Sequence, residues 1–362
     1  MLCRLSRLVY VSQTVSINQP KFCQTTSQIK DVYSVISFYH LNGLEMVEPL
    51  AKEIKGWLED KRATGRIYIN EIGVNGQLCM TNQDCMEFRK AFQSSLRLKD
   101  IKVKVHSTDF NVFRKLRVRY GKLLENLNSE VNLGETGEYL NNKDWNKTLD
   151  EEPDSIILDI RNDYEWEVGR FHGAKKPKYR QFKEFPKFAD EVISLAKKGD
   201  QKVLMYCTGG IRCEVFSSML KTRGLEEVYQ LKDGVLGYGE GSVENTRHWE
   251  GNLFVFDDRL VVPIDGVVGG EKDRSISTCR HCGHSANMVY NCNALDCNEF
   301  HISCMPCAVK MNGCCSDLCK ANTIHHFVKR NSRQWPKSIK EGKMIGRGDL
   351  YREWVTHMSH SQ

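Results

Sequence analysis

The chain has 362 residues, of which 40% are hydrophobic and 27% charged, and its formal net charge is +6. This length predicts two to three domains. No apolar run approaches the roughly 20 residues needed to span a bilayer, which argues against a membrane-embedded protein. The sequence contains no motif for an organic cofactor, and it does not set the oligomeric state.

Residues 1–30 contain Arg, Lys, Ser, Thr and Gln but neither Asp nor Glu. This composition is typical of a mitochondrial transit segment, although a disordered polar leader is an alternative. We therefore expect the protein in mitochondria or in the cytoplasm, and the acid-free leader favours mitochondria.

The segment 31–125 is predicted to form an α+β domain. Its strands are marked by β-branched and aromatic residues, its helices by apolar residues at helical spacing, and Asn75-Gly76 is a strong hairpin signal. The expected elements are strand 32–39, helix 47–58, strand 66–71, helix 84–92, and strands 101–106 and 116–120. Together with a strand after the hairpin turn, they predict the split βαβ arrangement of ferredoxin-like folds.

Basic residues gather toward the end of this domain. They include Lys102, Lys104, Arg114, Lys115, Arg117 and Arg119. Because side chains alternate along a strand, Lys102 and Lys104 share one face, and so do Arg117 and Arg119. Such a stripe is typical of a surface that binds nucleic-acid phosphates. A solvated sheet face without a partner fits the pattern equally well.

The segment 135–255 alternates strands with helices. Its expected elements are strand 155–161, helix 188–196, and strands 202–206 and 227–231. This alternation predicts a doubly wound parallel sheet covered on both faces. Ligands bind beyond the carboxyl ends of such strands, where we expect Cys207 and Arg161. Alternatively, Asp159 and Arg161 are structural and pair with each other beneath the loop that follows Tyr206.

That loop is the main candidate for chemistry, and it runs through Cys207, Thr208, Gly209, Gly210, Ile211, Arg212 and Cys213. The backbone amides of such a turn converge on one point, and the following helix adds positive potential there. Both effects lower the pKa of a thiol and stabilise an anion formed on it. The spacing from Cys207 to Arg212 is C-x4-R, one residue shorter than the C-x5-R loop that wraps phosphate in cysteine phosphatases. The shorter cradle favours a sulfur atom or a hydroxide-sized group.

The segment 256–325 is rich in cysteine, and the tail 326–362 is basic. Two C-x2-C pairs about twenty residues apart are typical of zinc sites. Nine thiols exceed the four that one ion needs, so the pattern allows a second ion, and His281, His284 and His301 are further candidates. The division of ligands between ions stays open. The candidate ligands are Cys279, Cys282, Cys292, Cys297, Cys304, Cys307, Cys314, Cys315 and Cys319.

Several stretches resemble a known family. Residues 159–174 are similar to the D-x-R-N-x-x-E-x-x-x-G-H-x-x-G-A segment of rhodanese domains, with Arg170 in place of the usual His. Residues 206–214 (YCTGGIRCE) and 254–259 (FVFDDR) resemble the oxygen-dependent tRNA uridine hydroxylases. These proteins have an acylphosphatase-like N-terminal domain, a central rhodanese domain and a cysteine-rich extension. Two departures are an inserted residue after Glu71, where the family reads E-G-I-N-G, and Ser303 in place of one cysteine of a pair.

The resemblance implies an enzyme that hydroxylates the wobble uridine of tRNA with molecular oxygen, and in which Cys207 is the essential residue. The loop amides would stabilise an adduct on Cys207. Arg212 either holds the loop or the substrate anion, or forms a salt bridge to Asp159 or Glu165. Cys213 either resolves an adduct as a disulfide or packs in the helix. The competing hypotheses are a sulfurtransferase that carries sulfur on Cys207 and a non-catalytic RNA-binding zinc scaffold.

Overall fold

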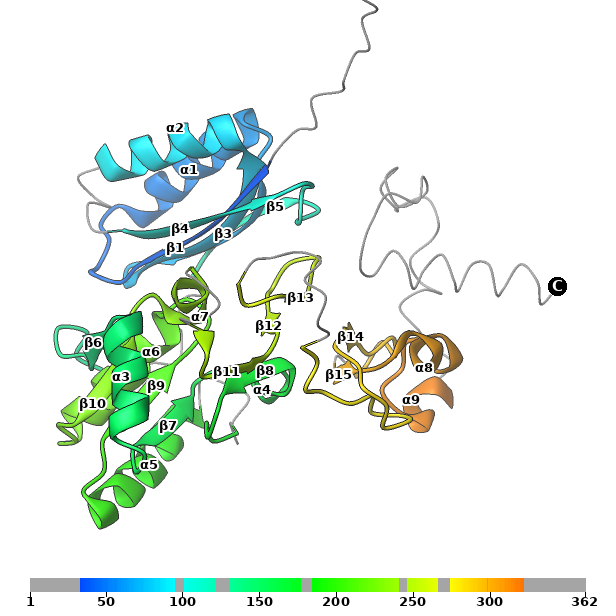
Figure 1. The fold of residues 1–362 in the computed structure, drawn as a ribbon. Coiled ribbons are helices and arrows are strands. Elements are labelled where there is room, and N and C mark those ends of the chain that lie inside the picture. The colour runs from blue at the N-terminus through cyan, green and yellow to red at the C-terminus, as the bar shows by residue number, and fades with distance from the viewer. Residues whose placement is uncertain are drawn as a thin grey trace, which may run out of the picture. The chain divides into compact units, whose positions relative to one another are not determined.

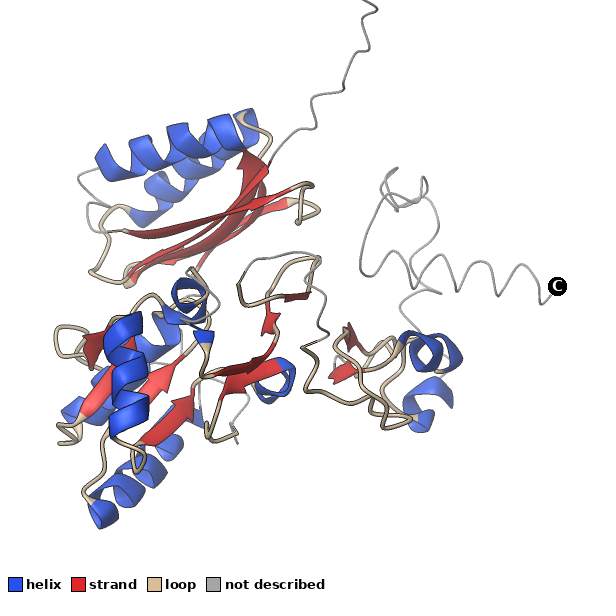
Figure 2. Ribbon diagram, in the orientation of Figure 1, coloured by secondary structure: helices blue, strands red, loops and turns tan. Residues whose placement is uncertain are grey.

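The computed structural model describes residues 33–94, 101–121, 131–176, 184–240, 246–265, 274–297 and 299–321. The predicted leader and the basic tail lie outside these ranges. The described part of the chain contains no helix that is both long and apolar enough to cross a membrane. Figure 1 shows the order of the elements, and Figure 2 shows their distribution between helix and strand.

The N-terminal domain is a five-stranded sheet in the order β4-β1-β3-β2-β5, with two helices on one face (Figure 1). Strand β1 is antiparallel to β3 and β4, whereas β2 is antiparallel to β3 and parallel to β5. The elements are β1 Tyr33–His40, α1 Val47–Asp60, β2 Thr64–Asn70, β3 Gly73–Thr81, α2 Asn82–Ser94, β4 Lys102–Thr108 and β5 Leu116–Tyr120.

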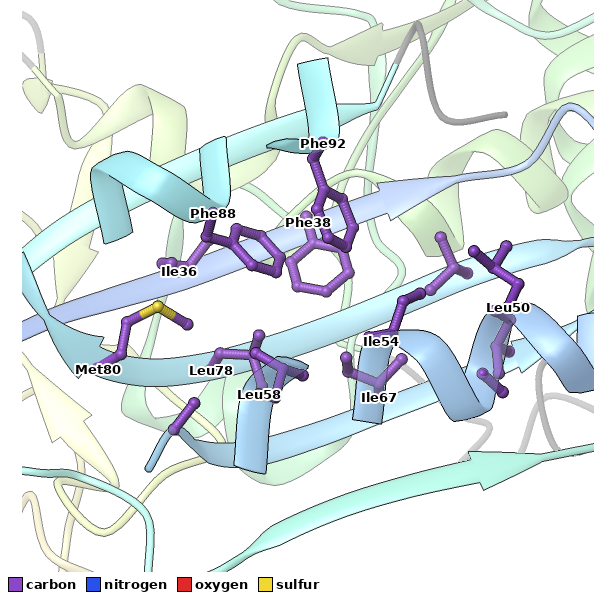
Figure 3. Close-up of a cluster of buried hydrophobic side chains, with 14 of the residues drawn as sticks. Ile36, Phe38, Leu50, Ile54, Leu58, Ile67, Leu78, Met80, Phe88 and Phe92 are labelled. Atoms are coloured by element: carbon purple, nitrogen blue, oxygen red, sulfur yellow. The ribbon is translucent and has the colours of Figure 1, made fainter. Parts of the chain in front are cut away.

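The core of this domain lies between the helices and one face of the sheet, as Figure 3 shows. Helix α1 buries Leu50, Ile54 and Leu58 because these apolar positions recur every three to four residues and therefore share one side of the helix. They pack with Phe88 of α2 and with alternate strand residues such as Ile36. The opposite face of the sheet carries polar side chains and a small apolar cluster of Val35, Cys79 and Val112.

The predicted hairpin turn at Asn75-Gly76 is wrong. The chain turns instead at Glu71 and Ile72, where β2 meets β3. The Oδ1 atom of Asn70 accepts hydrogen bonds from the turn amides of Ile72 and Gly73, at 3.1 and 3.3 Å. Gly76 lies inside β3, where a Cβ atom would stand 2.2 Å from Cζ of Phe38. The glycine is therefore explained by close packing, and the Asn-Gly signal was misleading.

The central domain is built on a four-stranded parallel sheet in the order β6-β10-β9-β7. Apolar clusters cover both faces of this sheet, so the residues of β9 are fully buried. The elements are β6 Glu138–Leu140, α3 Asn142–Glu151, β7 Ile156–Asp159, α4 Asp163–Val168, β8 Gly169–Phe171, α5 Phe185–Gly199, β9 Val203–Tyr206, α6 Ile211–Thr222, β10 Val228–Leu231, α7 Gly234–Tyr238 and β11 Trp249–Gly251.

The cysteine-rich region follows with short elements only. They are β12 Leu253–Phe254, β13 Val261–Val262, β14 Val289–Asn291, β15 Phe300–Ile302, α8 Met305–Lys310 and α9 Asp317–Ala321. The pairs β12 with β13 and β14 with β15 are antiparallel. With so little regular structure, this region is held mainly by side-chain packing, which gathers Leu260, Cys279, Val289 and Ile302 in one apolar cluster.

Candidate active site and metal sites

Cys207 stands at the end of β9 and begins the turn that leads into α6. Gly210 has φ 103°, which a residue with a side chain rarely adopts, and its amide donates to the Sγ atom of Cys207 at 3.1 Å. Helix α7 packs against the turn and supports it, because the amides of Val235 and Leu236 donate to the carbonyls of Cys207 and Thr208 at 2.9 and 3.0 Å. The turn is thus held rigid around the sulfur.

The surroundings of the Cys207 sulfur favour a thiolate. Burial alone would raise its pKa, but the Cys213 thiol donates to it, the Arg212 charge lies nearby, and the amides of Cys213 and Gly210 point at it. Together these groups lower the pKa of Cys207 to about 6. Burial and the neighbouring Cys207 raise the pKa of Cys213 well above its usual value, so Cys213 stays a protonated donor. The pair therefore consists of one anion and one thiol at neutral pH.

Arg212 forms a forked ion pair with Glu165 of α4. Its two terminal nitrogens donate to the two carboxylate oxygens at 2.8 and 3.0 Å, and one of them also donates to Oγ1 of Thr208 at 3.1 Å. The same carboxylate accepts from the amide of Asn162 and so caps α4. The salt bridge to Glu165, which was one of the two expected roles of Arg212, is therefore present, and Arg212 also lines the cavity next to Cys207.

Asp159 and Arg161 lie beneath the loop and not in the cleft. Arg161 is 2% exposed and donates to both oxygens of Asp159, with its shortest contact 2.6 Å, and to the carbonyl of Gly169. The hydroxyl of Tyr206 donates to Asp159 at 2.7 Å. The structural alternative for Asp159 and Arg161 accordingly describes their position, and the expectation that Arg161 faces the ligand is wrong.

A cavity of about 300 Å³ lies over the Cys207 loop. One side is formed by the loop itself, and the other by the polar face of the N-terminal sheet, which contributes Tyr39, Tyr68 and Asn75. The hydroxyl of Tyr39 donates to Glu214 at 3.0 Å, and Lys102 donates to the same carboxylate at 2.7 Å. These contacts tie β1 and β4 to α6, so two domains build one site.

The six basic residues that were predicted to bind RNA divide into two groups. Lys102 pairs with Glu214 at 2.7 Å, Lys104 with Asp233 and Glu240 at 3.6 Å each, and Arg114 with Asp258 at 3.1 Å. The other three have no ion pair with any described residue. These are Lys115, Arg117 and Arg119.

Eight cysteines form two groups of four, each able to hold one metal ion. All the sulfur atoms of a group lie within 4.8 Å of one another, close to the roughly 3.8 Å that a tetrahedral ion with 2.3 Å bonds requires. One group is Cys279, Cys282, Cys304 and Cys307, and the other is Cys292, Cys297, Cys315 and Cys319.

Cys314 belongs to neither group, so its role as a ligand stays a prediction. Four other thiols already complete the nearby group, and Cys314 packs instead with Cys292 and Ala294. The histidines His281 and His301 lie outside both groups as well, and His284 lies beside Cys282 without joining the four sulfurs. The loss of one cysteine at Ser303 removes no ligand, because Cys304 takes part.

Models of known families match all three regions. The UPF0176 acylphosphatase like domain matches residues 33–123, the rhodanese-like domain matches 142–240, and the rhodanase C-terminal model matches 250–320. The tRNA uridine(34) hydroxylase of Protochlamydia amoebophila is 37% identical over 298 residues, which cover 81% of this chain and 91% of that protein. The chain belongs to the tRNA uridine(34) hydroxylase family. The predicted family and the predicted fold class are both confirmed.

A second relative agrees with this assignment. The tRNA uridine(34) hydroxylase of Chlamydia felis is 38% identical over 303 residues, 83% of this chain and 91% of that protein. Among solved structures, the rhodanese-like domain of an Anabaena protein is similar at 18% identity and a TM-score of 0.24, covering 37% of this chain and 86% of that one.

The sequence alone did not identify the residues of the N-terminal sheet that line the cavity. Tyr39 and Arg66 both line it, and no local pattern marks them. Glu214 and Phe256 lie within the YCTGGIRCE and FVFDDR stretches, but the sequence assigns neither of them a role. Phe256 lines the cavity, and Glu214 accepts hydrogen bonds from Tyr39 and Lys102.

Replacing Glu165 with Gln should destabilise this member of the hydroxylase family by about 3 kcal/mol, because Arg212 would keep a mostly buried charge without its partner. Urea denaturation measures the loss. The matched control is Glu167→Gln on the same helix, whose 42% exposed side chain pairs with Lys176 and should cost under about 1 kcal/mol. Equal losses for the two variants would contradict this account.

The thiolate absorbance of Cys207 should titrate with a midpoint near pH 6, read at 240 nm as wild type minus Cys207→Ser. Cys213→Ala removes a donor to the sulfur and should raise the midpoint. Because the folded pKa is below the ordinary value of 9.0, the thiolate adds stability that is complete above about pH 9 and is lost as the pH falls to about 6. A midpoint near 9 in the folded protein would exclude a preformed thiolate.

Proposed function

We propose that this protein hydroxylates uridine at the wobble position of tRNA, giving 5-hydroxyuridine with molecular oxygen as co-substrate, and that Cys207 is the catalytic residue. The observation that carries the proposal is the combination of family membership with a low-pKa cysteine facing a nucleoside-sized cavity. Wobble uridine lies in a single-stranded loop, so its base can be splayed out into such a cavity.

The second candidate is sulfur transfer through a Cys207 persulfide. The amides and Arg212 around the sulfur suit any anionic adduct, including a persulfide. The N-terminal sheet over the loop favours the hydroxylase, because a sulfur donor such as thiosulfate is far smaller than the cavity of about 300 Å³ and needs no second domain to bind it.

Lys115, Arg117 and Arg119 are the basic residues that best fit a path for the RNA backbone. They carry no ion pair within the described ranges, whereas Lys102, Lys104 and Arg114 neutralise acidic groups of this chain. Arg117 and Arg119 are exposed and share the face of the sheet that lines the cavity. We infer that they contact phosphates next to the target nucleotide.

The two four-cysteine groups are proposed to hold structural zinc. Four thiolates with no position left for water are the donor set of structural zinc sites, and thiolate ligands disfavour the hard cations calcium and magnesium. For the location of the protein, the acid-free leader supports mitochondria. A reporter fused to residues 1–30 tests this directly.

Nucleoside mass spectrometry of tRNA tests the function. Cells lacking the protein should lose 5-hydroxyuridine and its derivatives, and cells that express it under ¹⁸O₂ should carry the label at C5 of the base. Unchanged nucleosides in the deletion would refute hydroxylation. A cyanide and thiosulfate assay on the purified protein then tests sulfur transfer, and turnover that depends on Cys207 would support it.

A further inference from the structure

The face of the N-terminal sheet that lines the cavity includes two rows of polar side chains. Residues opposite each other on paired strands point to the same side. The register places Lys102, Tyr39, Asn75, Tyr68 and Arg119 in one row, and Lys104, Ser37, Gln77, Arg66 and Arg117 in the next. The alternate residues of β3, Val74 and Leu78, are fully buried in the core under the helices. The two rows therefore face away from that core, toward the Cys207 loop.

Asn75 is at the centre of the first row, and its amide is available. It lines the cavity together with Cys207 and is only half-buried. No described residue makes a hydrogen bond to its side chain. Two of its neighbours are engaged, because Gln77 accepts from Arg66 at 2.9 Å and Tyr39 donates to Glu214 at 3.0 Å. Asn75 is thus a free amide within the cavity that holds the reactive sulfur.

An amide has the donor and the acceptor that the edge of uracil requires. Uracil presents the N3 proton as a donor beside O4 as an acceptor, and a side-chain amide can meet both at once. On the basis of the proposed function, we propose that Asn75 binds the edge of the target uracil, its Oδ1 accepting from N3–H and its Nδ2 donating to O4. Asn75 is a residue for base recognition that presents the pyrimidine ring to Cys207.

The test measures binding and not turnover, in a Cys207→Ser background. Two RNA stem-loops are compared, one with uridine at the target position and one with the pyrimidin-2-one nucleoside, which lacks both O4 and the N3 proton. Cytidine is a poor probe, because a rotated amide pairs with its edge too. The protein with Asn75 should prefer uridine by about 10- to 100-fold, and Asn75→Ala should abolish the preference.

Two further variants keep the result interpretable. Asn75→Asp has the same shape and keeps the acceptor but loses the donor to O4, so it should weaken the preference. The matched control is Gln77→Ala in the same cavity, whose amide oxygen is held by Arg66; it should leave the preference intact. A preference that survives in Asn75→Ala would overturn the inference. Uridine preference without any hydroxylation by the Cys207 protein would refute the proposed function and leave this inference standing.

Discussion

Cys207→Ser should abolish formation of 5-hydroxyuridine, with a loss of activity on the order of 10⁴-fold or more. The reason is electrostatic, since a serine hydroxyl cannot ionise near neutral pH, whereas the pKa of Cys207 is about 6. The amides of the loop and the Arg212 charge would then have no anion to stabilise. The activity is measured as 5-hydroxyuridine formed in tRNA by cells that express the variant in place of the wild type.

The control for this prediction is Cys85→Ser. Cys85 is a buried cysteine of α2 that lies outside the cavity and beside Ser34. The hydroxyl of Ser34 can accept a hydrogen bond from a serine introduced at this position. We expect activity within a few-fold of wild type for this variant. If Cys207→Ser kept substantial activity, the chemistry would have to be assigned to another residue of the cavity, and the role given to the loop would be wrong.

We expect two equivalents of zinc per chain, and a single cysteine substitution in either group should remove one of the two. Cys282→Ser should leave about one equivalent by removing a ligand from the first group, and Cys297→Ser should do the same in the second. Structural zinc supplies about 10–16 kcal/mol in small zinc peptides, and the described part of this region has only short helices and strands. A strong chelator should therefore unfold it. Metal analysis by mass spectrometry gives the counts, and near-ultraviolet circular dichroism reports the loss of packing.

Cys314→Ser is the matched control, because Cys314 is adjacent to the second group but outside it. This variant should keep two equivalents of zinc. A fall to one would show that Cys314 is a ligand after all and that the grouping of the sulfurs is different. Less than one equivalent in the wild type would refute the assignment to zinc.

Local sequence patterns predicted the parts of the site that are local in the chain. The C-x4-R loop between a buried strand and a helix is one such part, and the C-x2-C pairs are another. The patterns failed where the answer depends on contacts between distant segments. Asn75-Gly76 has the composition of a turn, but the position of Phe38 on the neighbouring strand decides its place within β3.

The same limit explains why the sequence did not divide the basic residues into paired and unpaired groups. It also explains why the sequence did not identify the sheet residues that line the cavity. Lys102 and Arg119 look alike in the sequence, and only the pairing with Glu214, 112 residues away, distinguishes them. Tyr39 carries no signal because its partner is 175 residues distant. Charge and periodicity report which residues a segment exposes, but they contain no information about the segment that will face them.

The contact between Tyr39 and the Cys207 loop has an evolutionary consequence. A Cβ atom at Gly210 would stand 2.7 Å from the Tyr39 hydroxyl, and the φ of Gly210 already disfavours any other residue. A side chain at position 210 would therefore have to displace the Tyr39 hydroxyl as well as adopt a strained backbone conformation, so a substitution in the loop and one in the strand that covers it are expected to depend on each other.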